Sequence, residues 1–571
     1  MPAGPADAVS ILDRARAWLA QDPDGETRRE LRALIEAAEG GDEAAGADLE
    51  DRFSARLAFG TAGLRGELGA GSNRMNRVLV AQAAAGLAAY VLDRTSRDGA
   101  DAAAPAIIVG YDGRRNSHVF AQDSAEIFAG AGLRAILLPR LLPTPVLAFA
   151  VRALGAAAGV MVTASHNPPN DNGYKVYLGG ADEGSQIVAP ADAEIAAHIE
   201  RVAVEGDIAS LPRSLGYEIA PESVVDDYIA ATAAVAPAPR GAEGLTWVYT
   251  AMHGVGWETL SRILEAAGYP APVPVPEQLE PDGTFPTVAF PNPEEPGAMD
   301  LAFARAREVG AELVIANDPD ADRLAVAVPD ESAPDGWRRL TGNQIGLLLG
   351  WRAARLASEA GATEGASLAC SLVSSPGLKA VADHYGLGFH ATLTGFKWIS
   401  RAPGIVFGFE EALGYLVNPE TVRDKDGVSA AVAMLGMVSE ARGRGAGLAD
   451  LLAEFDETFG AFASDQISIR VDDVSTISRI MAALRARHPS VIGDVAVDRV
   501  DDLLEGVDDL PPGDVLRLWL EDGSRVVVRP SGTEPKLKLY LDVRGDSAAD
   551  AAGRIERLSA GARELLDRLG G

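Results

Sequence analysis

The feature that most constrains the fold of this chain is the alternation of short apolar runs with helical stretches. In the first third of the chain, AIIVGYD, AILLP and GVMVTA are typical of buried β-strands, and helical segments separate them. Strands that alternate with helices predict parallel α/β sheets. In such sheets, ligands bind at the loops that follow the carboxyl ends of the strands. Polar loops that directly follow apolar runs are therefore the candidate functional segments.

The chain has 571 residues, too many for one hydrophobic core, so several domains are expected. Residues 1–50 are predicted to be a helical extension, because apolar positions such as Ile11, Ala15 and Leu19 have the spacing of an amphipathic helix. A Pro/Gly-rich break at residues 234–243 separates two strand-and-helix series, and the C-terminal strands are predicted to be antiparallel. The expected α/β domains span residues 51–215, 216–340 and 341–462, and an α+β domain spans residues 463–571.

The chain is strongly acidic, with a formal net charge of −31. This charge repels nucleic acid and anionic membrane surfaces, so neither is expected as a partner. An anionic substrate would then need a local cluster of Arg and Lys. No stretch is long and apolar enough to span a bilayer, and the first residues do not form a signal peptide pattern, so a cytoplasmic protein is expected. The one cysteine, Cys370, has small and apolar neighbours and is predicted to be a buried thiol.

The first candidate site is NDPDADR, residues 317–323, which directly follows the apolar run ELVIA. In extended chain, side chains at alternate positions share one face, so Asp318, Asp320 and Asp322 are expected to converge on one cation. Mg²⁺ is the natural occupant of such a set. A calcium-binding EF-hand loop is excluded, because the Gly and the Glu that it requires are missing from their positions. A solvated acidic turn remains the alternative.

The second candidate site is TASHNPPNDNGYKVY, residues 163–177, which follows the apolar run GVMV. Ser165 is therefore expected at a strand-to-loop turn. Its neighbour His166 is not expected to act as the base of a catalytic triad, because adjacent side chains diverge in extended backbone. No G-x-S-x-G elbow surrounds the serine, so an acyl-transfer hydrolase is disfavoured. From these residues alone, Ser165 is either a structural turn residue or a nucleophile.

The third candidate site is RPSGTEPK, residues 529–536. An arginine can bind two phosphate oxygens at once, and successive N–H groups around a glycine can form an anion-binding nest. An ordinary hairpin turn is the alternative. No ATP-binding or dinucleotide-binding glycine motif is complete in the chain, so neither cofactor is implied. The candidate phosphate-binding residues are Arg529, Ser531, Gly532, Thr533 and Lys536.

With these three loops in this order, the chain resembles the α-D-phosphohexomutases, the superfamily of phosphoglucomutases and phosphomannomutases. TASHNPP is similar to the family's phosphoserine loop, DPDADR to its metal loop and RPSGTEPK to its phosphate-binding loop, and the resemblance extends from about Phe59 to the end. It implies four domains around a central cleft. Three of them would be similar α/β domains with mixed sheets, and the fourth a smaller C-terminal α+β domain.

The resemblance also implies roles for further residues. Arg65, in FGTAGLRG, is expected to face the phosphoserine, and Lys175, in NGYKVY, is the candidate general acid and base. Lys397, in TGFKWI, and Glu410 and Glu411, in GFEEALGY, are expected to recognise the sugar. His166 is counted with the catalytic residues and Arg323 with those that bind substrate.

The implied reaction interconverts hexose 1-phosphate and hexose 6-phosphate through phosphorylated Ser165 and a hexose 1,6-bisphosphate, with Mg²⁺ on Ser165, Asp318, Asp320 and Asp322. The expected partner is a phosphorylated sugar, and the protein is expected to be a monomer or homodimer. Relatives often have a serine two places after the first sugar-binding glutamate, where this chain has Ala412. A phosphopentomutase or a glucose 1,6-bisphosphate synthase therefore remains an alternative. A sugar phosphatase and a non-catalytic sugar-phosphate binding protein are the other two.

Overall fold

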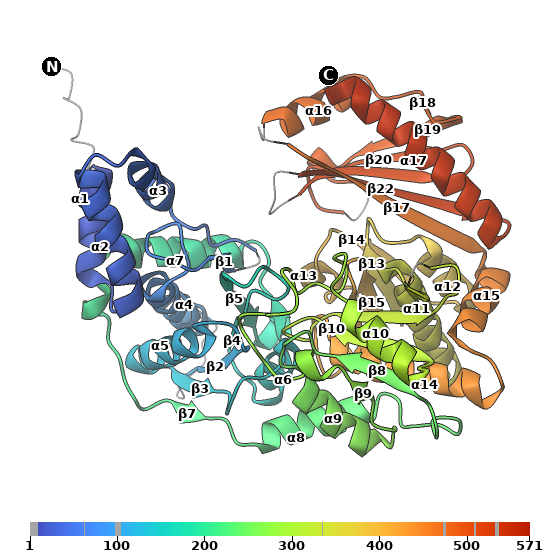
Figure 1. The fold of residues 1–571 in the computed structure, drawn as a ribbon, viewed down its shortest axis with the longest axis horizontal. Helices are drawn as coiled ribbons and strands as arrows, with labels where there is room; N and C mark the ends of the chain where they lie inside the picture. The colour runs from blue at the N-terminus through green and yellow to red at the C-terminus, as the bar shows by residue number, and fades with distance from the viewer. Residues whose placement is uncertain are drawn as a thin grey trace. The chain divides into compact units, whose positions relative to one another are not determined.

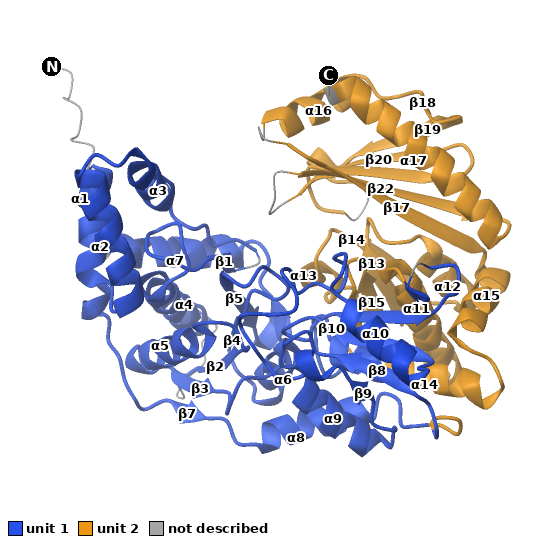
Figure 2. Cartoon of the chain, in the orientation of Figure 1, with its two compact units in different colours: residues 1–238, 243–338, 420–432 blue, residues 239–242, 339–419, 433–571 orange. Residues whose placement is uncertain are grey.

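The structure is a computed structural model that describes residues 10–61, 63–97, 104–333, 335–471, 475–507, 510–531 and 536–570 (Figure 1). The chain divides into two compact units (Figure 2). Unit 1 comprises residues 1–238, 243–338 and 420–432, and unit 2 comprises residues 239–242, 339–419 and 433–571. Among the described residues, no helix combines the length and the apolar character needed to cross a bilayer.

The N-terminal extension of unit 1 is helical, as its sequence predicts. Its helices are α1 (Ile11–Gln21), α2 (Gly25–Glu39) and α3 (Glu43–Phe53). Ser10, Asp24 and Asp42 cap their N-termini, because each side chain accepts a hydrogen bond from a backbone N–H of the first turn. Apolar side chains such as Leu31 and Phe53 are buried in the same core as the first sheet. The extension is therefore an integral part of unit 1.

The first sheet of unit 1 is mixed. Its strand order is β1-β5-β4-β2-β3-β7, with β6 paired to β5. The strands are β1 (Leu64–Glu67), β2 (Ala106–Tyr111), β3 (Arg134–Leu137), β4 (Ala158–Val162), β5 (Asp171–Leu178), β6 (Ser185–Gln186) and β7 (Glu218–Ile219). The helices of this region are α4 (Arg77–Arg97), α5 (Ser117–Gly130), α6 (Thr144–Ala153), α7 (Ala191–Glu205) and α8 (Ser223–Ala233). β4 and β2 are parallel, whereas β5 runs antiparallel to β4.

The second sheet of unit 1 is also mixed, with the strand order β12-β11-β10-β8-β9. β10 runs parallel to β8 and antiparallel to β11. The elements are β8 (Trp247–Thr250), α9 (Gly256–Ala267), β9 (Val273–Pro274), α10 (Asp300–Val309), β10 (Leu313–Asn317), β11 (Leu324–Pro329) and β12 (Trp337–Arg339). β10 and β11 are consecutive antiparallel strands. The acidic loop that connects them therefore lies at the carboxyl end of β10.

Unit 2 begins with a third mixed sheet, of order β14-β13-β15-β16. Thr341 caps its first helix through a capping box with Gln344, which explains why the helix begins there. The elements are α11 (Gly342–Glu359), β13 (Ser367–Ser371), α12 (Gly377–Tyr385), β14 (Gly388–Thr392), α13 (Phe396–Ile399), β15 (Ile405–Glu410), β16 (Gly414–Leu416), α14 (Gly427–Gly443) and α15 (Leu448–Phe459). The first residues of α14 belong to unit 1.

The fourth sheet, in unit 2, has the order β17-β22-β21-β20-β19-β18, and each neighbouring pair of strands in this order is antiparallel. The elements are β17 (Ala461–Arg470), α16 (Ser475–Ala486), β18 (Val491–Ile492), β19 (Val495–Asp502), β20 (Leu516–Leu520), β21 (Arg525–Pro530), β22 (Lys536–Gly545) and α17 (Ala548–Gly570). Apolar residues of α16 and α17 share a core with the strands. Three mixed sheets followed by an antiparallel α+β region are the predicted fold class.

Candidate active site

Ser165 lies in the loop between β4 and β5, three residues beyond the end of β4. Its backbone has a φ of 52°, in the left-handed region that is unusual for a residue other than glycine. The Thr163 hydroxyl accepts a hydrogen bond of 2.8 Å from the Ser165 N–H and so supports this turn. The Ser165 Oγ donates to Asp318 Oδ2 at 2.8 Å. The side chain of the serine therefore faces the acidic loop and not only its own turn.

The prediction that His166 diverges from Ser165 is wrong. The His166 Nδ1 lies 3.2 Å from the Ser165 Oγ. The prediction assumed extended backbone, but the left-handed conformation of Ser165 brings the two neighbouring side chains to the same side. Burial and the charges of Arg323 and Arg65 hold the pKa of His166 well below its usual range. The histidine is therefore neutral at pH 7.

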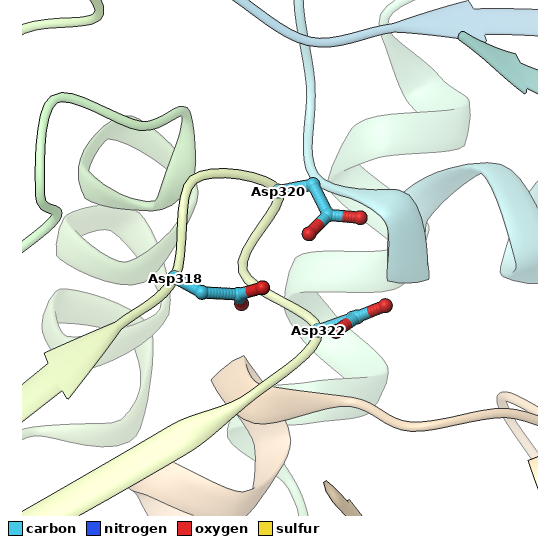
Figure 3. Close-up of side chains that lie close together, drawn as sticks. All are labelled: Asp318, Asp320 and Asp322. Atoms are coloured by element: carbon cyan, nitrogen blue, oxygen red, sulfur yellow. The ribbon is translucent and has the colours of Figure 1, made fainter. Parts of the chain in front are cut away.

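Asp318, Asp320 and Asp322 are fully buried in the loop between β10 and β11 (Figure 3). One carboxylate oxygen of each lies within 4.8 Å of the others. The alternative of a solvated acidic turn is wrong, because all three side chains are shielded from water. The expected cause of their convergence is wrong as well. The chain is not extended here: Ala321 has a φ of 55°, and its N–H donates to the Asp318 carbonyl at 2.8 Å.

The three aspartates fit a metal ion. Asp320 Oδ1 and Asp322 Oδ1 are buried, and neither has a hydrogen-bond partner among the described residues. An unpaired anionic oxygen is costly to bury, and a hard divalent cation is its natural partner. Thr144, at the N-terminus of α6, donates to the other oxygen of Asp320 at 2.5 Å and orients that carboxylate. The set of ligands consists of oxygen atoms alone, as Mg²⁺ prefers.

Two buried lysines neutralise part of this negative charge. The Lys175 Nζ donates to Asp320 Oδ2 and to Asp322 Oδ2, each at 2.7 Å. The Lys425 Nζ lies 3.4 Å from Asp322 Oδ2. Burial opposes the charge of Lys175, but Asp320 and Asp322 outweigh it and raise the pKa of that lysine.

The pKa values of the carboxylates are shifted in different directions by these surroundings. Burial beside Asp320 and Asp322 raises the pKa of Asp318 well above its usual range. Burial acts in the same direction on Asp322, but Lys175 and Lys425 outweigh it and lower its pKa. We call Ser165, Asp318, Asp320, Asp322 and Lys175 the serine–aspartate centre.

Two arginines lie next to the serine–aspartate centre. Arg65, on β1, is half-buried, and its Nη1 donates to Asn167 Oδ1 in the serine loop at 3.3 Å. The Arg323 Nε lies 4.0 Å from Asp322 Oδ1, and its backbone N–H donates to Asp318 Oδ1 at 2.9 Å. Both guanidinium groups thus add positive charge next to the serine–aspartate centre.

In unit 2, Glu410 ends β15 and Glu411 directly follows it. The hydroxyl groups of Ser371 and Ser374 donate to Glu411 Oε2 at 3.1 Å and 3.0 Å. Ser374 Oγ also accepts from the Glu411 N–H at 3.1 Å. These bonds fix the carboxylate. Lys397 lies in α13 and is half-buried, as are Glu410 and Glu411.

The candidate phosphate loop connects β21 and β22 in unit 2, so the motif occurs at a hairpin. Arg529 is on β21, and Ser531 and Lys536 close the described part of the turn, where the Ser531 N–H donates to the Lys536 carbonyl at 2.8 Å. Gly532 and Thr533 lie outside the described residues. Their assignment to phosphate binding stays a prediction.

Some contacts were not predicted from the sequence. Lys425 stands between two aspartates in RDKDG, just before the apolar start of α14, and this pattern alone does not distinguish a site lysine from a helix cap. Ser371 and Ser374 follow the apolar run of β13 and could have been found as a strand-end pair. Cys370, by contrast, is buried as predicted, and burial raises the pKa of its thiol to about 12.

Comparison with known proteins identifies the class. Matches to the phosphoglucomutase/phosphomannomutase domains follow one another along the chain: alpha/beta/alpha domain I at residues 56–205, domain II at 226–331, domain III at 341–458 and the C-terminal domain at 468–556. A "Probable phosphomannomutase" of Haemophilus influenzae is 54% identical over 492 residues, which are 86% of this chain and 98% of that protein. The phosphopentomutase of Homo sapiens is 34% identical over 579 residues, 93% of this chain and 91% of that protein.

A solved structure agrees in fold. The structure of a phosphoglucomutase/phosphomannomutase family protein of Burkholderia thailandensis matches this chain with a TM-score of 0.68 and 20% sequence identity. The match covers 90% of this chain and 98% of that protein. The chain therefore belongs to the phosphoglucomutase/phosphomannomutase family. It is a mutase, an isomerase that moves a phosphoryl group within its substrate.

Proposed function

We propose that this mutase interconverts hexose 1-phosphate and hexose 6-phosphate, with glucose or mannose as the sugar, by passing a phosphoryl group through Ser165. The observation that carries the proposal is the 2.8 Å contact of the Ser165 Oγ with Asp318 in a buried cluster of carboxylates. A hydroxyl in that place can accept and return a phosphoryl group whose charge a cation offsets. The 54% identity to a protein named as a phosphomannomutase supports a hexose as the substrate.

The cycle begins with Ser165 phosphorylated. A hydroxyl oxygen of the sugar attacks the phosphorus, and the bond between phosphorus and the Ser165 Oγ breaks, which yields a hexose 1,6-bisphosphate. The proton that the sugar hydroxyl loses is the one that the Ser165 Oγ regains, so a single relaying group balances the step. We assign this relay to Lys175, the buried lysine that contacts two aspartates of the same centre. Its pKa is raised, so it is an ammonium that gives a proton to the Ser165 Oγ and takes up the proton of the sugar hydroxyl. The bisphosphate then reorients, and Ser165 takes back the other phosphate.

The residues around the serine have distinct tasks in this proposal. Asp318, Asp320, Asp322 and Ser165 would hold Mg²⁺, which when bound supplies positive charge to the phosphoryl oxygens where negative charge develops. Arg65 and Arg323 would add to that charge. His166 is neutral and lies 3.2 Å from the Ser165 Oγ, so it can orient the serine hydroxyl.

Unit 2 carries the other residues that we assign to substrate binding. We assign Lys397, Glu410 and Glu411 to the binding of the sugar hydroxyls. The orientation of the Glu411 carboxylate supports its assignment, because two serine hydroxyls donate hydrogen bonds to it. The non-reacting phosphate would be bound by Arg529, Ser531, Gly532, Thr533 and Lys536. A phosphate is held firmly by a guanidinium fork and by backbone N–H groups.

A pentose phosphate is the second candidate substrate. Two observations favour it: Ala412 replaces the serine that often contacts ring hydroxyls in relatives, and a phosphopentomutase is 34% identical over almost the whole chain. A glucose 1,6-bisphosphate synthase has the same first half-reaction and would be recognised by release of the bisphosphate. Cytoplasmic location and the state of monomer or homodimer stay predictions.

The test is a coupled assay of glucose 1-phosphate, mannose 1-phosphate and ribose 1-phosphate with Mg²⁺, with and without a bisphosphate activator. We expect the highest kcat/KM for a hexose phosphate, and a higher value for ribose 1-phosphate would favour the pentose. Ser165→Ala should abolish turnover, whereas Ser261→Ala, at a surface serine of α9, should not. Intact mass should show one phosphoryl group on the wild type and none on Ser165→Ala. Normal turnover by Ser165→Ala would refute the mechanism, and release of phosphate without isomerised sugar would indicate a phosphatase.

A further inference from the structure

Arg114 lies in the loop after β2, three residues beyond the end of that strand. Ser165 has the corresponding position after β4, which is the parallel neighbour of β2 with Tyr111 opposite Val162. The pairing of the two strands therefore brings the two loops together. The arginine side chain is fully buried, although no anionic side chain of the described residues lies within hydrogen-bond distance of it: Asp112 Oδ2 is 3.6 Å from its Nε. Another set of acceptors must therefore account for the burial of this charge.

The acceptors are four backbone carbonyls of the serine loop. The Arg114 Nη2 donates to the carbonyls of Ser165 and Asn167, both at 2.6 Å. The Nη1 donates to the carbonyls of Pro168 and Asp171, at 2.8 Å and 3.1 Å. All four N–H groups of the two terminal nitrogens are thus used on the loop 165–171. Residues 163–170 have no regular secondary structure, and Asp171 begins β5. The guanidinium is therefore the group that ties these loop carbonyls together.

We propose that Arg114 is the positioning residue of the phosphoryl-carrying serine. The inference rests on the proposed function of Ser165 and names the group that fixes its geometry. Among the described residues, no hydrogen bond or ion pair joins Arg114 to Asp318, Asp320 or Asp322, so it acts through the loop. Its bond to the Ser165 carbonyl holds the serine in the left-handed conformation, with a φ of 52°, that directs the Oγ toward Asp318.

The surroundings of Arg114 hold it in one place. The carboxylate of Asp112 accepts from the Arg114 N–H at 3.0 Å and from the Ser117 hydroxyl at 2.6 Å. The ring of Phe285 lies against the guanidinium, 4.9 Å from its central carbon, and is itself buried. The planar fork of an arginine can serve four carbonyls in one plane, whereas the ammonium of a lysine has three N–H groups that point in other directions. The site therefore requires an arginine.

The test compares Arg114→Lys and Arg114→Met with Arg77→Met. Arg77 is a matched control, because it binds Asp123 through two hydrogen bonds in the same unit and has no part in the serine loop. Transfer chemistry loses about 100-fold in rate for a displacement of about 1 Å. We expect kcat to fall about 100-fold in Arg114→Met and about 10-fold in Arg114→Lys, while KM for the sugar phosphate changes less than about threefold. Arg77→Met should lower thermal stability and leave kcat unchanged.

A second readout does not depend on the reaction. Amide hydrogen exchange of the peptide covering residues 163–171 should be faster in Arg114→Met than in the wild type and unchanged in Arg77→Met. If Arg114→Met does not fold, Arg114→Lys provides both readouts. Wild-type kcat, or wild-type exchange of the serine loop, in a folded Arg114 variant would overturn the inference. If the wild type itself has no Ser165-dependent turnover, the proposed function fails, and the exchange measurement still decides whether Arg114 holds the loop.

Discussion

The serine–aspartate centre of unit 1 and the recognition loops of unit 2 are built differently. In the centre, the serine and all three aspartates are at most 3% exposed, and each has a partner from another loop or strand. The recognition loops, named for the role that we propose for them, are the segments that carry Lys397, Glu410, Glu411, Arg529 and Lys536, and these side chains are half-buried. A buried, cross-linked set of charges suits a transfer step that is the same for every substrate. A more open set of side chains suits contact with sugars that differ.

The largest effect is expected for Asp322→Asn. The substitution removes a carboxylate from the proposed cation site and an anionic partner from Lys175 and Lys425. We expect kcat to fall about 1,000-fold or more for glucose, mannose and ribose phosphates alike, because positive charge at the transferred phosphoryl group contributes several kcal/mol. Steady-state rates on the three substrates test this. Asp330→Asn, at a surface loop of the same unit, is the control. Loss for one sugar only would show that the centre also selects substrate.

A smaller and unequal effect is expected for Glu411→Gln in the recognition loops. Ser371 and Ser374 would still orient the side chain, but the charge that we propose accepts from sugar hydroxyls would be lost. A hydrogen bond to a charged group is worth about 1.5–3 kcal/mol, so kcat/KM should fall about 10- to 150-fold. The ratio of hexose to pentose values should change as well, whereas Glu440→Gln, at an exposed ion pair, should change neither. Equal losses for all sugars would place Glu411 with the transfer step.

The smallest effect on turnover is expected at Asp426, which is buried in unit 1 and accepts from the Tyr228 hydroxyl at 3.0 Å and from the Ser429 N–H at 2.9 Å. Burial raises the pKa of Asp426 from 3.8 to about 6. The folded protein therefore holds this proton more tightly than the unfolded chain. The stabilisation that this proton gives is fully present below about pH 4 and is lost as the pH rises through about 6, by on the order of 1–3 kcal/mol.

Asp426→Asn removes that titration. Denaturant unfolding at pH 4, 5, 6 and 7 gives the free energy of unfolding of the variant and of the wild type. The value for the variant minus the value for the wild type should increase with pH. The kcat of the variant at a fixed pH should equal that of the wild type. A difference in stability that is constant over this range would show that Asp426 does not titrate there.

Much of the fold followed from the sequence, because the period of the apolar runs is a local property. β2, β3, β4 and β10 lie where their apolar runs predict, and Thr341 begins α11 because its side chain and Gln344 cap it locally. The chemical groups that the site offers as metal ligands can also be read from the local sequence. Three aspartates after a strand indicate oxygen ligands, whatever conformation the loop adopts. The domain boundaries predicted from composition stay predictions.

What the sequence determined by itself is the alternation of strands and helices, the order of the three loops and the kinds of chemical group that they carry. The tertiary structure alone decided which groups meet. Ser165 and Asp318 are 153 positions apart, and their contact depends on the pairing of strands in two sheets and on the packing between them. The left-handed backbone of Ser165, which brings His166 to its side, is held by a carbonyl bond to Arg114. No local pattern encodes such a bond, because a buried charge takes its partners from whatever the fold places beside it.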